Sequence, residues 1–202
     1  MFIQVIQGQV SDAGQVKAAL ERWSKDLQPG SSGWLGTTAG VTEDGRFIAL
    51  ARFESEEAAQ RNSDRPEQGE WWAETAKLFT SDPTFSNSKD VMVDVNGDPD
   101  DATFVQVMQG RSSDPERAKE LMSDDSVDWA AFRPEIIASV GCGHSGGAYT
   151  MAIYFTSEEA AREGEKKEPP PELTAQMEEM DKLSVGTPEF YDLKDPWLIS
   201  PS

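Results

Sequence analysis

The sequence predicts an α+β fold built from two tandem β-α-β-β-α-β domains, and three observations point to it. The segment FESEEAA at 53–59 returns as FTSEEAA at 155–161, and FIQVIQG at 2–8 returns as FVQVMQG at 104–110. Both pairs are displaced by 102 residues, which indicates an internal repeat. The length of 202 residues also suits two domains of about 100 residues each, a common domain size.

The first repeat opens with an apolar strand and a capped helix. Residues 2–7 are largely apolar on both faces, as in a strand that is covered on both sides. Asp12 is the expected N-cap, with Gln15 in the capping-box position. An apolar stripe at helical spacing follows, consisting of Val16, Ala19, Leu20, Trp23 and Leu27. Pro29 and Gly30 then end the helix.

A hairpin and two further elements complete the repeat. Strands at 34–41 and 46–54 are joined through Asp44-Gly45, a strong signal for a tight hairpin. Ser55 is expected to cap a helix whose first turn carries two glutamates, which complement the helix dipole. The remaining expected elements are a helical stretch at about 70–79 and a last strand at about 89–95.

The repeat also sets the predicted domain bounds. We expect a first domain at 1–95, an acidic linker rich in turn residues at 96–103, and a second domain with a C-terminal tail at 104–202. Beyond the second SEEAA the displacement grows to 105 residues, so three residues are inserted near 169–171, where we expect a loop.

The two faces of the predicted sheets differ in character. A β-α-β-β-α-β unit places both helices on one face of a four-stranded sheet, so the other face needs a cover. In the third strand Phe47, Ala49, Ala51 and Phe53 form the expected helix-facing side. The opposite side carries Ile48, Leu50 and Arg52 in the first copy and Thr150, Ala152 and Tyr154 in the second. We therefore expect the helix-free faces to pack sheet to sheet as an intramolecular pseudo-dimeric barrel with a partly polar interior.

These features resemble the dimeric α+β barrel superfamily, a ferredoxin-like group that includes the antibiotic biosynthesis monooxygenases. The resemblance covers Phe2 to about Leu198 and rests on element order, the duplication and the FIQVIQG/FVQVMQG pair. It implies a cofactor-independent monooxygenase acting on a small aromatic or quinone-like compound. Alternatives within the same resemblance are a non-catalytic, ligand-binding or stress-associated barrel protein and a structural interaction protein.

Composition limits the expected partners and compartment. With 37 acidic and 18 basic residues, the net charge of −19 repels phosphate groups, so neither nucleic acid nor anionic membrane is an expected partner. The chain starts without signal-peptide features, has no apolar run of about 20 residues and contains one cysteine. We expect a cytoplasmic protein that is a monomer with an internal pseudo-two-fold axis or a dimer of such units.

The sequence suggests neither a metal site nor a cofactor. His144 is the only histidine and is expected to be exposed beside a hairpin turn, which argues against haem ligation. Cys142 is expected to be a small buried residue. Residues 94–98 resemble the start of a calcium loop, but Gly97 is misplaced and the twelfth position is Val105, so an acidic linker is the better interpretation.

Two pairs of glutamines recur in the copies and are candidates for a site. Because side chains alternate along a strand, Gln4 and Gln106 point to the face opposite Gln7 and Gln109, and alternation does not say which pair faces the interior. Such glutamines either make cross-strand hydrogen bonds or contact a ligand. We select Gln4 and Gln106 as ligand-binding candidates.

Three further residues complete the predicted site. Arg52 and Tyr154 occupy equivalent positions and are the candidate catalytic residues, since a buried arginine needs a carboxylate or an anionic ligand and a tyrosine can donate a proton. The open alternative for them is an internal ion pair or a contact between the repeats. Trp71 aligns with Gln176, which suggests a position not needed for packing. It is a candidate wall for a flat ligand, or else a partner surface or a loop anchor.

Overall fold

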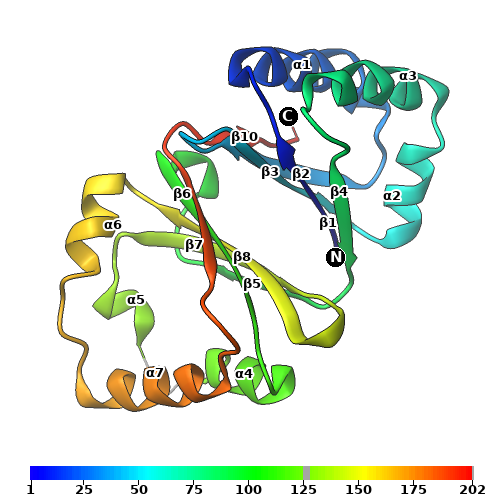
Figure 1. The fold of residues 1–202 in the computed structure, drawn as a ribbon. Coiled ribbons are helices and arrows are strands. Elements are labelled where there is room, and N and C mark those ends of the chain that lie inside the picture. The colour runs from blue at the N-terminus through cyan, green and yellow to red at the C-terminus, as the bar shows by residue number, and fades with distance from the viewer. Residues whose placement is uncertain (125–127, 202) are drawn as a thin grey trace. The chain divides into compact units, whose positions relative to one another are not determined.

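The computed structural model describes residues 1–124 and 128–201, and its strands form two open antiparallel sheets (Figure 1). Sheet 1 has the strand order β10-β2-β3-β1-β4, and sheet 2 has the order β5-β7-β8-β6-β9. The chain divides into two compact units. Unit 1 consists of Met1–Val91 and Asp195–Ser202, and unit 2 of Met92–Lys194.

The elements of the first repeat follow the predicted order. They are β1 (Phe2–Gln9), α1 (Ala13–Asp26), the 3₁₀ turn η1 (Gln28–Gly30), β2 (Trp34–Val41), β3 (Arg46–Phe53), α2 (Glu56–Ser63), α3 (Pro66–Thr75), η2 (Ala76–Leu78), β4 (Thr84–Ser88) and β5 (Val91–Val95). Both predicted N-caps are present, because Asp12 accepts a hydrogen bond from the Gln15 backbone and Ser55 accepts one from the Ala58 backbone. Helix α3 begins earlier than expected because Pro66 is accommodated in its first turn.

The second repeat contains the same elements with a short additional helix. They are η3 (Pro99–Asp101), β6 (Phe104–Arg111), α4 (Pro115–Met122), α5 (Trp129–Phe132), β7 (Ile136–Gly143), η4 (Ser145–Gly147), β8 (Ala148–Phe155), α6 (Glu158–Gly164), α7 (Pro171–Leu183), β9 (Glu189–Leu193) and β10 (Trp197–Ile199). The repeated SEEAA segments begin α2 and α6, which confirms them as helix starts.

Each sheet has five strands instead of the expected four, because the repeats exchange their last strands. Strand β10 leaves the second repeat and pairs with β2 of sheet 1, with Trp197 opposite Ala39. Strand β5 leaves the first repeat and lies at the edge of sheet 2 beside β7. The prediction of one last strand at 89–95 in the first domain was therefore wrong, since β4 completes the order within sheet 1 and β5 belongs to sheet 2. Pairing with a distant segment leaves no local trace in the sequence.

Because of this exchange, the bounds of the two compact units differ from the bounds of the two repeats. The predicted division at 95 and 104 follows the repeat, whereas the units divide between Val91 and Met92 and again between Lys194 and Asp195. Neither sheet closes into a barrel, because each ends in two edge strands. The division at 95 and 104 and the sheet-to-sheet packing of the two repeats stay predictions.

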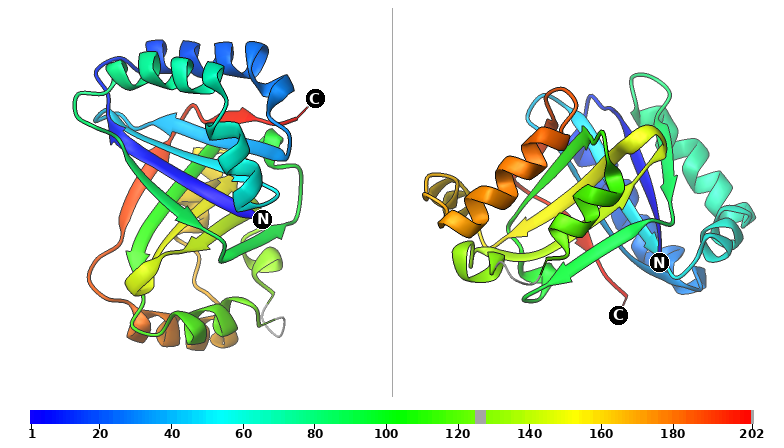
Figure 2. Two further views of the ribbon diagram at one scale, coloured as in Figure 1. Left: turned by 90° about the vertical axis from the view of Figure 1, so that its right-hand side faces the viewer. Right: turned by 90° about the horizontal axis from the view of Figure 1, so that it is seen from below.

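Aromatic rings fill the core of unit 1. Helices α1 and α3 lie over one face of sheet 1 (Figure 2), where Phe47, Ala49 and Phe53 are buried, as predicted for the helix-facing side. The Trp23 and Trp34 ring centroids are 5.1 Å apart in an edge-on arrangement. Further ring contacts join Trp23 to Trp71, Trp71 to Trp72, and Trp72 to Phe79. Burial of these large rings stabilises the packing of helices on the sheet.

Candidate functional site

The predicted catalytic residues lie on the helix-free sides of two different sheets. Arg52 is opposite Ile3 and Gly36 in sheet 1, and its buried Nε has no hydrogen-bond partner among the residues that the structure describes. Gly36 has a φ of 135°, and a Cβ there would lie 2.5 Å from Arg52 Nη2, so glycine leaves room for the guanidinium. Tyr154, in sheet 2, is 1% exposed. A joint catalytic role for the two stays a prediction.

The structure decides which glutamines face the helices. Gln4 and Gln106 share the side of Phe2 and Phe104, so Gln7 and Gln109 lie on the opposite face. Gln4 Nε2 donates to Asn87 Oδ1 at 3.3 Å, and Gln106 Nε2 donates to Asp192 Oδ1 at 2.8 Å. Both glutamines therefore make cross-strand hydrogen bonds, and a contact with ligand stays a prediction.

Trp71 packs in the core of unit 1. It is half-buried, lies against the cluster around Trp23 and donates from Nε1 to the Ala19 carbonyl at 3.0 Å. The expectation that packing does not need this position was wrong, because the equivalent Gln176 is also buried, at 8% exposure. A role for Trp71 as a ligand wall stays a prediction.

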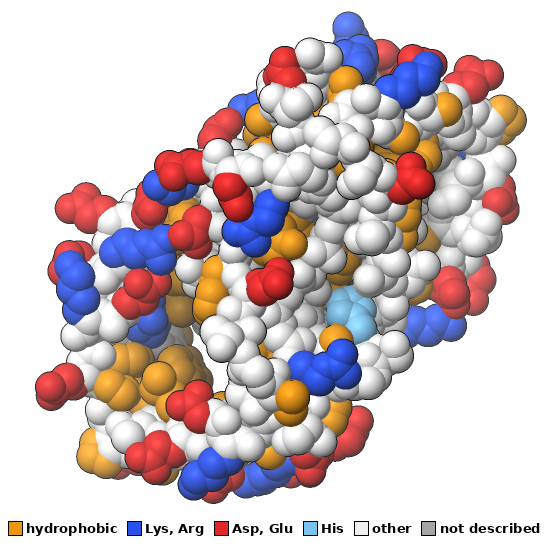
Figure 3. Space-filling model, in the orientation of Figure 1, with side chains coloured by type: hydrophobic (Ala, Val, Ile, Leu, Met, Phe, Trp, Pro, Cys, Tyr) orange, Lys and Arg blue, Asp and Glu red, His pale blue; other side chains and the backbone are white. Residues whose placement is uncertain are grey.

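The helix-facing side of unit 2 distributes its large side chains differently from that of unit 1. Gln176 and Met177 stand where unit 1 has Trp71 and Trp72, while Met151 and Ile153 stand where unit 1 has Ala49 and Ala51. Figure 3 shows a hollow over unit 2, lined with hydrophobic side chains, beside α7 and β9. Half-buried apolar residues of the central strands face this side: Met108, Met151 and Ile153. Trp129 of α5 is also half-buried and donates from Nε1 to Gln176 Oε1 of α7. We call this space the unit 2 hollow.

A charged network lies on the same face of sheet 2. Asp192 accepts from Gln106 and also forms a salt bridge with Arg162, whose Cζ lies 5.3 Å from the Phe104 ring centroid. Burial disfavours the charged form of Arg162, but hydrogen bonds to Asp192 and Glu165 outweigh it and raise the pKa of the guanidinium. The network therefore supplies a fixed, charge-bearing edge to an otherwise apolar surface.

Tyr149 places a hydroxyl on the helix-facing side of unit 2. A Cβ on Gly110 would lie 2.5 Å from the Tyr149 hydroxyl oxygen, so the glycine lets the tyrosine lie across β6. No described residue forms a hydrogen bond with this hydroxyl, and desolvation raises its pKa. Sequence reasoning treated Tyr149 only as part of an apolar face. The recurrence of glycine at positions 8 and 110 is the sequence signal that could have revealed it.

His144 belongs to a polar chain on the helix-free side of sheet 2. Its Nε2 lies 3.0 Å from Thr150 Oγ1 and 3.7 Å from Cys142 Sγ, and Gln109 Nε2 donates to the same threonine oxygen at 2.9 Å. The expectation of an exposed histidine was wrong, because the ring folds back onto β8 and is half-buried. Figure 3 shows the side chain in pale blue, reaching the surface. Cys142 is buried, as expected.

The pKa of His144 is expected to lie below the ordinary value of 6.5, because burial disfavours the imidazolium. His144 then binds a proton more readily in the unfolded chain than in the folded chain. The stability of the fold is therefore unaffected by protonation of His144 above pH 6.5 and decreases as the pH falls below that value. An NMR titration of the imidazole Hε1 signal, which is unambiguous in a chain with one histidine, measures the pKa directly. A pKa of His144 in the folded protein that equals or exceeds its pKa in 6 M urea would contradict the prediction.

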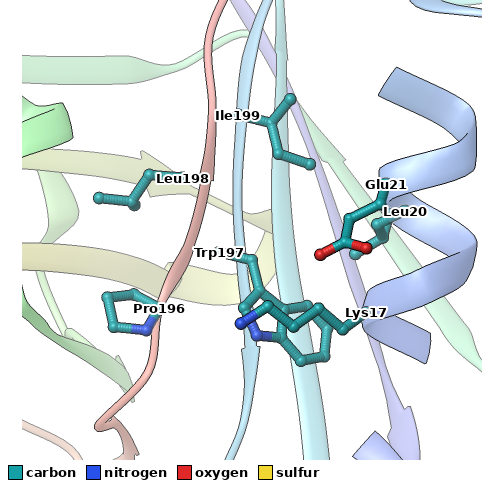
Figure 4. A pocket seen from close by; sticks show the side chains of 7 residues that line it. All are labelled: Lys17, Leu20, Glu21, Pro196, Trp197, Leu198 and Ile199. Atoms are coloured by element: carbon teal, nitrogen blue, oxygen red, sulfur yellow. The ribbon is translucent and has the colours of Figure 1, made fainter. Parts of the chain in front are cut away.

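A second concavity lies along the exchanged strand. This groove of about 230 Å³ is lined by Lys17, Leu20 and Glu21 of α1 and by Pro196–Ile199 (Figure 4). Figure 4 shows the three helix residues projecting toward the strand. Lys17 Nζ forms a 2.7 Å salt bridge with Asp195. This exposed ion pair joins α1 to the residues just before β10, and the ladder with β2 holds the strand in sheet 1.

Residues 1–124 and 128–201 contain neither a metal-binding cluster nor a membrane-spanning helix. No group of three or more His, Cys, Asp or Glu side chains in these ranges is placed to hold a metal ion. None of the helices described there is long and apolar enough to cross a membrane.

Comparison with known proteins identifies the fold. No protein-family model and no curated protein matches the sequence. Two similar solved structures carry the name "putative monooxygenase". The one from Lactobacillus acidophilus NCFM has a TM-score of 0.73 and 13% identity and covers 98% of both chains. The one from Fusobacterium nucleatum has a TM-score of 0.75 and 11% identity, covering 98% of this chain and 94% of that one. A protein described as anthrone oxidase-like has a TM-score of 0.64 and 14% identity, and the match covers 98% of this chain and 93% of that one.

The likeness extends over both repeats, and at these identities it establishes the fold and leaves the activity to be argued from the site. It confirms the predicted α+β class and the tandem arrangement of two ferredoxin-like domains. The chain therefore has the duplicated ferredoxin-like fold of monooxygenase-like proteins related to the antibiotic biosynthesis monooxygenases.

Proposed function

We propose that the protein binds a small aromatic molecule in the unit 2 hollow and oxygenates it without a cofactor. The observation that carries this proposal is a hydrophobic hollow between sheet and helices that has polar atoms of Gln106 and Tyr149 on the same face. Apolar concavities with a few polar groups are the usual form of small-molecule sites. The monooxygenase names of proteins with the same fold support the type of reaction.

An anthrone is a suitable model substrate because it carries the electrons that the reaction needs. Its CH₂ carbon is oxidised to a carbonyl, one atom of O₂ enters the product, and the other leaves as water. The reaction begins with loss of a proton from this CH₂ group, which places negative charge on the anthrone carbonyl oxygen. Tyr149 stays protonated at neutral pH, since its pKa is raised, and would donate a hydrogen bond to that oxygen.

Oxygen uptake with anthrone tests the proposal. In buffer with a chelator and no added flavin or haem, we expect one O₂ consumed for each anthraquinone formed. Replacement Tyr149→Phe is expected to lower kcat by about 100-fold, the usual effect of losing one oxyanion donor. The matched variant Tyr154→Phe is expected to keep its activity. The reverse result would move the site to the helix-free side of sheet 2, where Tyr154 lies.

The second candidate function is ligand binding without catalysis. It is favoured by the pairing of Asp192 with Arg162, because a paired carboxylate is a poor general base for removing the substrate proton. Under this alternative the protein binds anthrone, and oxygen is consumed no faster with the protein than without it. Under either proposal Gln4, Trp71 and Arg52 act outside the unit 2 hollow.

A further inference from the structure

We propose that the unit 2 hollow selects aromatic ligands that carry a hydroxyl group, because Gln106 presents its side-chain oxygen to them as a hydrogen-bond acceptor. The inference rests on the proposed binding of an aromatic molecule in this hollow. It adds the chemical group by which the site distinguishes ligands, namely the hydroxyl. Gln106 would contact this hydroxyl, and Asp192 would position the Gln106 amide.

The orientation of the Gln106 amide follows from its partner. An ionised carboxylate can only accept hydrogen bonds, so the 2.8 Å contact between Gln106 and Asp192 Oδ1 must involve the amide nitrogen. The other carboxylate oxygen of Asp192 is bound by Arg162, which holds the carboxylate in place. A rotated amide would set two oxygens against each other and lose a charge-assisted hydrogen bond. The amide oxygen, Oε1, therefore points away from Asp192.

Within the part of the chain that the structure describes, this oxygen is an acceptor without a donor. No described residue donates to Gln106 Oε1, although the side chain is half-buried. Gln106 lies opposite Ile153 in the register of β6 and β8, so it adjoins a residue of the hollow. A half-buried acceptor gains from a hydroxyl donor, whereas an ether of the same shape offers it nothing.

The first repeat provides an internal contrast. Gln4 contacts Asn87 at 3.3 Å, and an asparagine amide can donate or accept, so neither orientation of Gln4 is enforced. Gln60 stands at the position equivalent to Arg162, so no charge anchors the pair. Only the repeat with the hollow combines the fixed glutamine with a salt bridge.

Paired probes test the inference on the full-length protein. The Kd values of 1-naphthol and of 1-methoxynaphthalene are measured by equilibrium dialysis, and their ratio reports the preference for a hydroxyl. Gln106→Met is expected to reduce this preference about fivefold, because one neutral hydrogen bond is lost. The Kd of 1-methoxynaphthalene is expected to change less than about twofold. Asp192→Asn frees the amide to rotate and is expected to reduce the preference by a smaller factor. The matched change Gln4→Met should leave it unaltered.

The outcomes separate this inference from the proposal beneath it. Binding of both probes to the wild-type protein, with a preference that Gln106→Met does not change, would overturn the inference and leave the hollow as a ligand site. Failure of both probes to bind would overturn both. Far-UV circular dichroism of each variant shows whether the fold is retained, and Asp192→Asn supplies the second readout if Gln106→Met is unfolded.

Discussion

Replacing Met151 by tryptophan is expected to weaken binding of 1-naphthol by at least about 100-fold, the loss of a few kcal/mol. Met151 lies on the helix-facing side of β8, opposite Met108 at the centre of sheet 2, and is half-buried. An indole at this position would occupy the unit 2 hollow and exclude the ligand. Equilibrium dialysis of the variant against wild type measures the effect.

A matched substitution controls for the change of residue type. Met122 is 39% exposed at the end of α4, so Met122→Trp adds the same side chain away from the central strands. It is expected to leave the Kd of 1-naphthol within about twofold, since surface changes are usually small. Equal loss of binding in both variants, or undiminished binding in Met151→Trp, would show that the hollow is not the ligand site.

Replacing Trp23 by alanine is expected to lower the free energy of unfolding of unit 1 by about 3–5 kcal/mol, the usual cost of removing a large buried ring. Trp23 is 6% exposed, contacts Trp34 edge-on and donates from Nε1 to Gln68 Oε1 at 2.6 Å. Its loss would leave a cavity beside Trp71 and an unpaired amide. Urea unfolding gives the free energy, and tryptophan fluorescence reports chiefly on unit 1, which holds five of the six tryptophans.

An exposed aromatic residue provides the comparison for Trp23. Phe85 is 46% exposed on β4, although its ring centroid lies 5.2 Å from that of Trp72. Phe85→Ala is expected to cost about 1 kcal/mol or less, because little apolar area returns to water. Similar losses for the two variants would show that the ring cluster does not determine the stability of unit 1.

The candidate site was predictable only in part. Gln106 was selected from its recurrence in both copies, and it lies on the same face as the hollow. The roles of Asp192 and Arg162 were missed, because they come from β9 and α6 and meet Gln106 only through strand register and helix packing. Tyr149 was missed because an aromatic residue at an apolar strand position usually indicates core.

The sequence by itself determined the duplication, the order of strands and helices apart from α5 and the last strands, the helix caps and the division of each strand into two faces. These features depend on neighbouring residues, since caps act over three positions and side-chain alternation acts over two. The repeat then transferred each assignment from one copy to the other. Even His144 could be placed beside its turn in this way.

Only the tertiary structure decided which face meets the helices, where the core stays open, and which sheet receives each last strand. Alternation separates Gln4 from Gln7 but cannot say which of them faces a helix. The replacement of two tryptophans by Gln176 and Met177 is visible in the sequence, but the place of the hollow is visible only in the structure. Strand β10 has no local reason to leave its own repeat, because pairing with β2 joins residues more than 150 positions apart and is decided by the free energy of the whole fold.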